Sequence, residues 1–127
     1  MKVFVVVIFM MVSSQASALE SWDSAACRGA IALEMMKEPE IMEIYDRKVN
    51  TYYISYVRES DGKLWRFACK NDASVLWASI NDDSSQGRWR DHAADDILSA
   101  TSNGADSQVV KVCSKQAERC IEVKRRS

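Results

Sequence analysis

The sequence has little excess of charge of either sign. It contains 17 lysine and arginine residues against 18 aspartate and glutamate residues, and its net charge is −1. A protein that binds nucleic acid or an anionic membrane through bulk charge needs a strong basic excess. The composition therefore argues against nucleic acid and against a membrane surface as partners.

Apolar runs are also scarce, and the one long run lies at the start of the chain. Val3–Val12 follows Lys2 and precedes the small residues Ala16-Ser17-Ala18. This order predicts a cleavable signal peptide over residues 1–18, with cleavage after Ala18. Ten apolar residues would cover about 15 Å as a helix, about half of the hydrocarbon layer, so we predict no membrane span. Residues 19–127 then form one exported domain.

The pattern of the remaining residues predicts one helix followed by short strands. Ser21–Asp23 offers capping side chains, and a helix is expected over Ser24–Lys37, with Pro39 ending it or forcing a break. Residues 41–45 could form either a short strand or a helical turn, and the pattern does not decide between them. The expected strands are Thr51–Val57, Leu64–Lys70, Val75–Ile80, Asp96–Ser102, Ser107–Cys113 and Cys120–Lys124, and Arg88-Trp89-Arg90 is a candidate for another short one.

Turn signals connect these strands in chain order. Asp61-Gly62 and Asn103-Gly104 are typical of hairpins, and Asp82–Gly87 is a polar loop. We therefore expect an α+β fold, with the N-terminal helix packed on a curved antiparallel β-meander of about five or six strands. Arg125–Ser127 is expected to be a frayed tail. Large aromatics supply much of a small core, and the expected ones are Trp65, Phe67 and Trp77.

The four cysteines lack the close spacing of a zinc site, where ligands usually come in pairs two to four residues apart. An even number of cysteines in a short exported chain predicts disulfides instead, and three pairings are possible. We favour Cys27–Cys69, which would join the helix to the aromatic face of a strand. The second bridge would then be Cys113–Cys120, across a hairpin.

Few residues are candidates for chemistry. His92 is the only histidine, and with Asp91, Asp95 and Asp96 it could form a general base or a metal site. A polar loop is the simpler interpretation, because a catalytic histidine needs a nucleophile placed by the fold. The range 82–85 is acidic but lacks the spacing of a calcium loop. We therefore predict no catalytic residue, no metal and no cofactor.

The predicted binding residues are Arg88, Trp89 and Arg90. In an extended segment the two arginines share one face and Trp89 takes the other. The arginines could bind an anionic group, and Trp89 could stack on a ligand. The alternative is a buried Trp89 with the arginines in solvent or paired with nearby aspartates, and we favour that alternative.

A longer pattern resembles a group of small exported proteins of Gram-negative bacteria, over the span from the helix to about Asp96. The residues that carry the resemblance are Tyr56-Val57-Arg58, Asp61-Gly62, Trp65-Arg66-Phe67-Ala68-Cys69, Trp77-Ala78 and Gly87-Arg88-Trp89-Arg90. The resemblance implies a bacterial source and a periplasmic or secreted location, but no reaction. The cysteines of that group match Cys27 and Cys69, whereas the Cys113–Cys120 hairpin is an addition.

These observations predict an exported, non-catalytic binding module of the bacterial envelope, of the inhibitor or immunity type, whose partner is another protein. This is an argument from the class of protein. A small hydrolase that uses His92 and its neighbouring aspartates is the alternative. A structural factor without a small ligand is a third interpretation.

Overall fold

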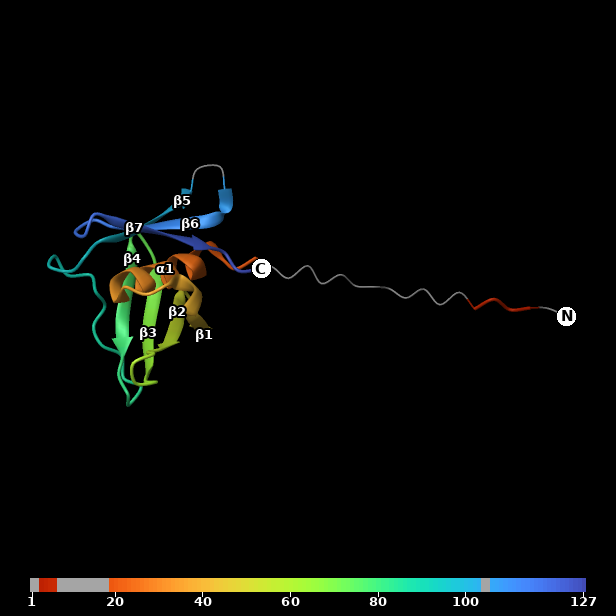
Figure 1. The fold of residues 1–127 in the computed structure, drawn as a ribbon, viewed down its shortest axis with the longest axis horizontal. Helices are drawn as coiled ribbons and strands as arrows, with labels where there is room; N and C mark the ends of the chain where they lie inside the picture. The colour runs from red at the N-terminus through yellow and green to blue at the C-terminus, as the bar shows by residue number, and fades with distance from the viewer. Residues whose placement is uncertain (1–2, 7–18, 104–105) are drawn as a thin grey trace.

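In the computed structural model, which describes residues 3–6, 19–103 and 106–127, one helix packs against an antiparallel sheet that curls into a half-barrel (Figure 1). The described elements are α1 (Trp22–Met35), the 3-10 helix η1 (Pro39–Ile41), β1 (Glu43–Lys48), β2 (Thr51–Val57), β3 (Leu64–Asn71), β4 (Val75–Ile80), β5 (Leu98–Asn103), β6 (Asp106–Ser114) and β7 (Arg119–Lys124). The strands are neighbours in chain order, as a meander requires. The predicted α+β fold is confirmed. The described sheet has seven strands rather than five or six, because the range left open contributes β1.

The helix begins at a side-chain cap and ends at a left-handed residue. The Ser21 hydroxyl accepts a hydrogen bond from the Ser24 N–H at 3.1 Å, which satisfies one of the free N–H groups of the first turn. Met36 has φ 55°, and the following Lys37 N–H returns to the Ala32 carbonyl at 2.8 Å. The helix therefore begins and ends slightly earlier than predicted.

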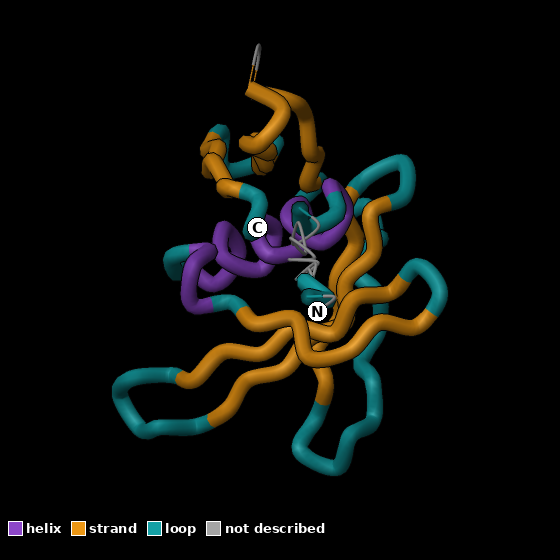
Figure 2. Tube along the Cα trace, turned by 90° about the vertical axis from the view of Figure 1, so that its right-hand side faces the viewer, coloured by secondary structure: helices purple, strands orange, loops and turns teal. Residues whose placement is uncertain are grey.

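The sheet bends sharply between β4 and β5, which pair only at Val75 and Leu98. Figure 2 shows α1 enclosed between the β1–β4 part and the β5–β7 part of the sheet. On the β5–β7 side the helix comes closest to the sheet at Gly29. A Cβ at this position would lie 2.6 Å from a methyl of Val123 and 2.7 Å from one of Val112. We call this contact of α1 with β6 and β7 the helix interface.

The core lies between the helix and the concave face of the sheet. It combines small helical residues with aromatic and branched side chains of the strands; the fully buried members include Ala25, Ala30, Ile31, Ile54, Phe67, Leu98, Val110, Val112 and Val123. Of the three aromatics expected there, Phe67 and Trp77 are buried and Trp65 is half-buried against the cluster.

Both favoured disulfides are present. Cys27 of α1 is bonded to Cys69 of β3, and Cys113 of β6 is bonded to its cross-strand partner Cys120 of β7. Two disulfides are typical of proteins that work in an oxidising compartment.

Two local predictions were wrong. Arg88-Trp89-Arg90 is not a strand, although the Gly87 and Arg90 N–H groups donate to carbonyls of β4 at 2.8 Å. The C-terminal tail is not frayed at Arg126: its carbonyl accepts from the Glu20 N–H at 2.6 Å, and its guanidinium donates to the Glu40 carbonyl at 2.8 Å.

Other predictions concern residues that the structure describes only in part. The signal peptide and the cleavage site after Ala18 lie outside the described residues, except for Val3–Val6, which has neither helix nor strand. Gly104 of the second hairpin signal also lies outside them. Within the described ranges, no helix is long and apolar enough to cross a membrane.

Candidate functional site

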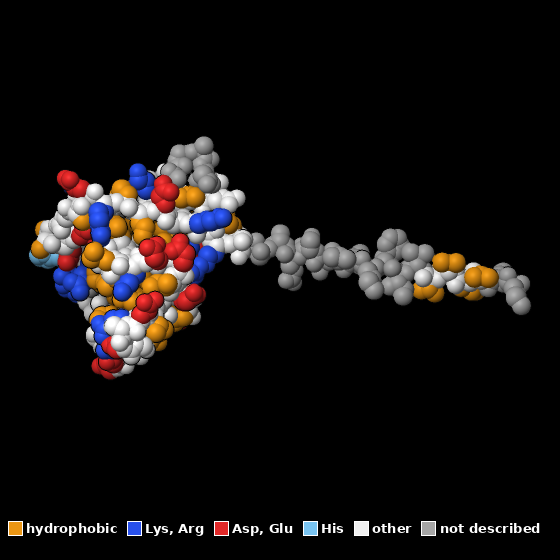
Figure 3. Space-filling view, viewed as in Figure 1, with side chains coloured by type: hydrophobic (Ala, Val, Ile, Leu, Met, Phe, Trp, Pro, Cys, Tyr) orange, Lys and Arg blue, Asp and Glu red, His pale blue; other side chains and the backbone are white. Residues whose placement is uncertain are grey.

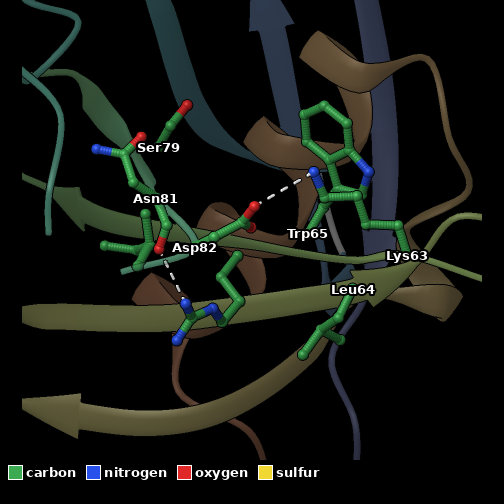
Figure 4. A pocket seen from close by; sticks show the side chains of 8 residues that line it. Lys63, Leu64, Trp65, Ser79, Asn81 and Asp82 are labelled. Atoms are coloured by element: carbon green, nitrogen blue, oxygen red, sulfur yellow. Dashed lines mark hydrogen bonds and ion pairs between the residues drawn. The ribbon is translucent and has the colours of Figure 1, made fainter. Parts of the chain in front are cut away.

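The β1–β4 part of the sheet has a hollow at the end that lies at the bottom of Figure 1. We call this end the distal end; it comprises the turns Arg58–Lys63 and Asn81–Ser85 with the adjoining strand ends. The distal hollow has a volume of about 270 Å³, and Figure 4 shows the side chains around it. Its lining residues are Lys63, Leu64, Trp65, Arg66, Ser79, Ile80, Asn81 and Asp82.

The turn between β2 and β3 has a defined geometry that positions this site. Gly62 has φ 68°, a conformation that glycine adopts at little cost. Asp61 accepts a hydrogen bond from the Lys63 N–H at 3.0 Å and forms an ion pair with Arg58. The hydrogen bond from Arg58 is the main reason that the pKa of Asp61 falls to about 2. The Asp-Gly turn signal thus fixes where Lys63 and the start of β3 lie.

Trp65 is the large aromatic residue of the distal hollow. The Arg58 guanidinium lies 5.0 Å from the centre of its ring, and the Lys63 ammonium lies 5.6 Å from it. Such cation–π contacts are worth about 0.5–1 kcal/mol at exposed sites. The indole Nε1 is buried and has no hydrogen-bond partner among the described residues, although a buried Trp N–H usually has one.

The charges of the hollow are unequal. Lys63 and Arg66 bring two cations, whereas Asp82 is the single acidic residue of the lining. Asp82 lies 3.6 Å from the Lys63 ammonium and is 87% exposed, so the pair is weak. The Arg66 guanidinium donates to two neutral oxygens, the Asn81 carbonyl at 2.9 Å and the Ser84 hydroxyl at 3.3 Å (Figure 4 shows the Asn81 bond).

Exposed apolar side chains border the distal hollow. Val57 of β2 and Leu64 of β3 are cross-strand partners, and they are 56% and 51% exposed. Val57 also lines a second hollow of about 210 Å³, together with the exposed Met36 and Ile41. Adjacent exposed apolar residues of this kind are typical of protein-binding surfaces.

The sequence did not single out this surface. Trp65 was assigned to the core, and Lys63, Arg66 and Asp82 are separated along the chain, so only the β3–β4 pairing brings them together. The Asp-Gly turn was the one available signal, because it marks the end of the sheet where the hollow forms.

The predicted binding residues lie in the loop between β4 and β5 and contact their own chain. Arg88 forms a bidentate ion pair with Asp95, at 2.6 and 2.9 Å. The Arg90 guanidinium lies 4.8 Å from the centre of the Trp77 ring. The ring of Trp89 lies 4.3 Å from the Lys70 ammonium.

Trp89 is half-buried and lies outside the hydrophobic core cluster. The favoured alternative was a buried Trp89 with the arginines in solvent or paired with nearby aspartates. The structure shows one such pair, Arg88–Asp95, and a Trp89 that is only half-buried. Whether Arg88, Trp89 and Arg90 bind a partner stays a prediction.

His92 lies exposed in the same loop. Its backbone N–H donates to Asp95 at 3.0 Å, and its Nδ1 accepts from the Ala94 N–H at 3.5 Å. The Asp95 carboxylate thus accepts hydrogen bonds from both Arg88 and the backbone N–H of His92. Within the described ranges, no group of three or more His, Cys, Asp and Glu is placed to hold a metal ion.

A second feature that the sequence did not show is an acid pair under this loop. Burial and a hydrogen bond with Asp96 raise the pKa of Glu34, at the end of α1, to about 7. Burial opposes ionisation of Asp96, yet hydrogen bonds from the Ser114 hydroxyl and the Gln116 N–H lower its pKa. A pair of carboxyl groups with separated pKa values can share one proton at neutral pH.

Charged side chains of both signs are interspersed over the face seen in Figure 3.

No protein-family model, curated protein or solved structure matches the chain. The resemblance to exported proteins of Gram-negative bacteria therefore stays a prediction.

Proposed function

We propose that this chain is an exported, non-catalytic module of the bacterial envelope or the extracellular medium that binds another protein, in the manner of an inhibitor or an immunity protein. The observation that carries the proposal is the exposed apolar surface of the distal end. Val57 and Leu64 are exposed there, and the exposed Met36 and Ile41 line the neighbouring hollow together with Val57. Burying such side chains against a partner removes apolar area from water, which is the main favourable term in association.

The surroundings of this surface suit a protein partner. Trp65 lies beside it, and Lys63 and Arg66 supply charged groups that a partner can pair with. Tryptophan and arginine are enriched among the residues that dominate binding energies. The two disulfides hold the framework that presents the surface, and they agree with a location outside the cytoplasm.

The hydrolase alternative has less support in the geometry. The nearest hydrogen-bonding carboxylate, Asp95, is engaged by Arg88 and by the backbone of His92 rather than by the imidazole. An orienting carboxylate would have to bond the ring itself.

Site-specific photocrosslinking in the producing cell tests the proposal. A photoreactive amino acid at Val57 or Leu64 should give a covalent adduct of defined mass with one protein. The matched control is Val49, an apolar residue that is 86% exposed in the β1–β2 turn and outside the distal end. Excess unlabelled protein should compete for the adduct, whereas the Leu64→Asp variant should not. Equal labelling from Val49, or equal competition by Leu64→Asp, would contradict the proposal.

A further inference from the structure

We infer that the distal hollow binds a carboxylate, supplied by an aspartate or glutamate side chain of the partner. This inference rests on the proposed function and names the chemistry of the partner at that surface. It follows from three features of the hollow: an excess of positive charge, an indole N–H without an acceptor, and an adjoining apolar border.

The excess of positive charge comes from Arg66. Its guanidinium bonds neutral oxygens of Asn81, Ser84 and the Tyr45 hydroxyl, and no described residue forms an ion pair with it. A guanidinium with free donors is well suited to a carboxylate, which accepts from it in a planar geometry. Arg58 adds no further charge, because Asp61 pairs with it.

Lys63 reinforces this attraction. Besides its contact with the Trp65 ring, its ammonium forms only one ion pair among the described residues, the loose one with the exposed Asp82 at 3.6 Å. A carboxylate placed in the hollow would replace that contact with one shielded from solvent, where the attraction between charges is stronger. An anion therefore gains from both cations of the lining at once.

The indole N–H of Trp65 selects for a hydrogen-bond acceptor. The group can only donate, and it is buried without a partner among the described residues. A buried donor left unsatisfied costs about 1–3 kcal/mol. The exposed side chains of Arg58 and Lys63 lie over the ring, and a bound acceptor would reach the N–H only if they changed rotamer and the indole turned toward the hollow.

The border of the hollow distinguishes a protein side chain from a free anion. Leu64 lines the hollow and is half exposed, and Val57 lies beside it in the sheet. A partner segment with an acidic residue next to an apolar one would satisfy the cations and cover this pair together. Inorganic phosphate could use the cations but not the apolar border.

The indole N–H signals in a ¹H–¹⁵N NMR spectrum test the inference directly. The probes are N-acetyl-glutamate methylamide and its neutral isostere N-acetyl-glutamine methylamide, added to the folded protein at pH 7. The glutamate probe should shift the Trp65 signal, assigned with a Trp65→Phe variant, in a saturable manner. The signals of Trp22, Trp77 and Trp89 should stay in place.

The comparison between probes and variants decides the outcome. We expect Arg66→Gln to weaken the titration about tenfold, which is the loss of one charge-assisted hydrogen bond. Arg66→Lys should retain part of the affinity, and thermal unfolding checks that both variants are folded. Equal shifts with the glutamine probe, stronger binding of inorganic phosphate, no Trp65 shift at the solubility limit, or an unchanged titration of Arg66→Gln would each overturn the inference.

Failure of the inference and failure of the proposed function can be told apart. If Leu64→Asp abolishes the crosslinked adduct but Arg66→Gln does not, the protein-binding function stands and the carboxylate site is refuted. If neither variant changes the crosslinking, the proposed function itself is refuted.

Discussion

Where α1 meets β6 and β7, apolar atoms pack so closely that even a methyl group has no room, whereas at the distal end apolar side chains of similar size lie in solvent. At the helix interface Gly29 faces Val112 and Val123, which are fully buried. At the distal end Val57 and Leu64 are half exposed. The first region has no capacity for another molecule, so its role is stability.

Polar groups differ between the two regions in the same way. Near the helix interface the buried Arg28 is fully engaged, by Glu20 and by the carbonyls of Pro39 and Lys124. At the distal end Arg66 bonds only neutral oxygens, and the Trp65 N–H has no partner among the described residues. A region whose polar groups are satisfied internally gains little from a ligand, whereas an unsatisfied one gains.

The largest effect should come from removing the disulfide that fastens the helix. Closing a loop of 42 residues, Cys27–Cys69 should stabilise the fold by about 4 kcal/mol in the chain-entropy model. The Cys27→Ala, Cys69→Ala variant should therefore unfold at a much lower urea concentration. Removing Cys113 and Cys120, only seven residues apart, is the internal control and should cost about 2.5 kcal/mol. A larger loss from the second pair would contradict the importance assigned to the bond between α1 and β3.

A smaller loss should follow from one added methyl group at the helix interface. Gly29→Ala places a Cβ within 2.7 Å of two valine methyls, and overpacking of this kind costs about 1–3 kcal/mol. Gly87→Ala is the matched control, because its Cβ would lie 3.4 Å from the Ser79 carbonyl oxygen. Chemical denaturation compares the two variants. An unchanged midpoint for Gly29→Ala would show that the helix can shift away from the sheet.

Trp89 should contribute less stability than a core aromatic. Truncating a core tryptophan costs about 3–5 kcal/mol, and we expect this for Trp77→Ala. Because Trp89 lies half-buried outside the core cluster, Trp89→Ala should cost about 1 kcal/mol. A loss as large as that of Trp77→Ala would assign Trp89 to the core after all.

The acid pair should make the stability depend on pH. The pKa of Glu34 rises from 4.5 to about 7 in the folded protein, so its contribution is fully present below pH 4.5 and is lost as the pH rises to about 7. Since Glu34 is only partly buried, solvent screening limits the loss, and we expect about 1 kcal/mol. Asp96, with a lowered pKa, acts oppositely and at more acidic pH.

The variant Glu34→Gln should remove this loss between about pH 5 and pH 7. Thermal unfolding at several pH values checks it, with Glu122→Gln, an exposed residue of β7, as the control. If wild type and Glu34→Gln lose stability in parallel, Glu34 does not carry the pH dependence.

The smallest effect on stability should come from the distal end. Leu64→Asp changes an exposed side chain, so the free energy of unfolding should shift by about 0.5 kcal/mol or less. The double variant Arg88→Ser, Arg90→Ser should stay within about the same limit per site. A marked destabilisation by Leu64→Asp would mean that the distal end is structural.

Local signals in the sequence sufficed for much of the fold. The helix with a cap within Ser21–Asp23, six of the strands and both disulfides were predicted. Caps, alternation and Asp-Gly turns are signals that act over a few residues. For β1 the sequence left a strand and a helical turn open, since Glu43–Lys48 is almost entirely exposed and has no alternating pattern. Its pairing with β2 decides its conformation.

The sequence by itself thus determined that this chain has one helix, a meander of strands and cysteines suited to two bridges. Only the tertiary structure decided which polar and aromatic residues meet. Trp65 and Arg66 stand next to Asn81 and Asp82 because β3 pairs with β4, and Glu34 reaches Asp96 because the helix crosses the bent sheet. Such contacts depend on register and on the direction of a bend, and local propensity does not encode either.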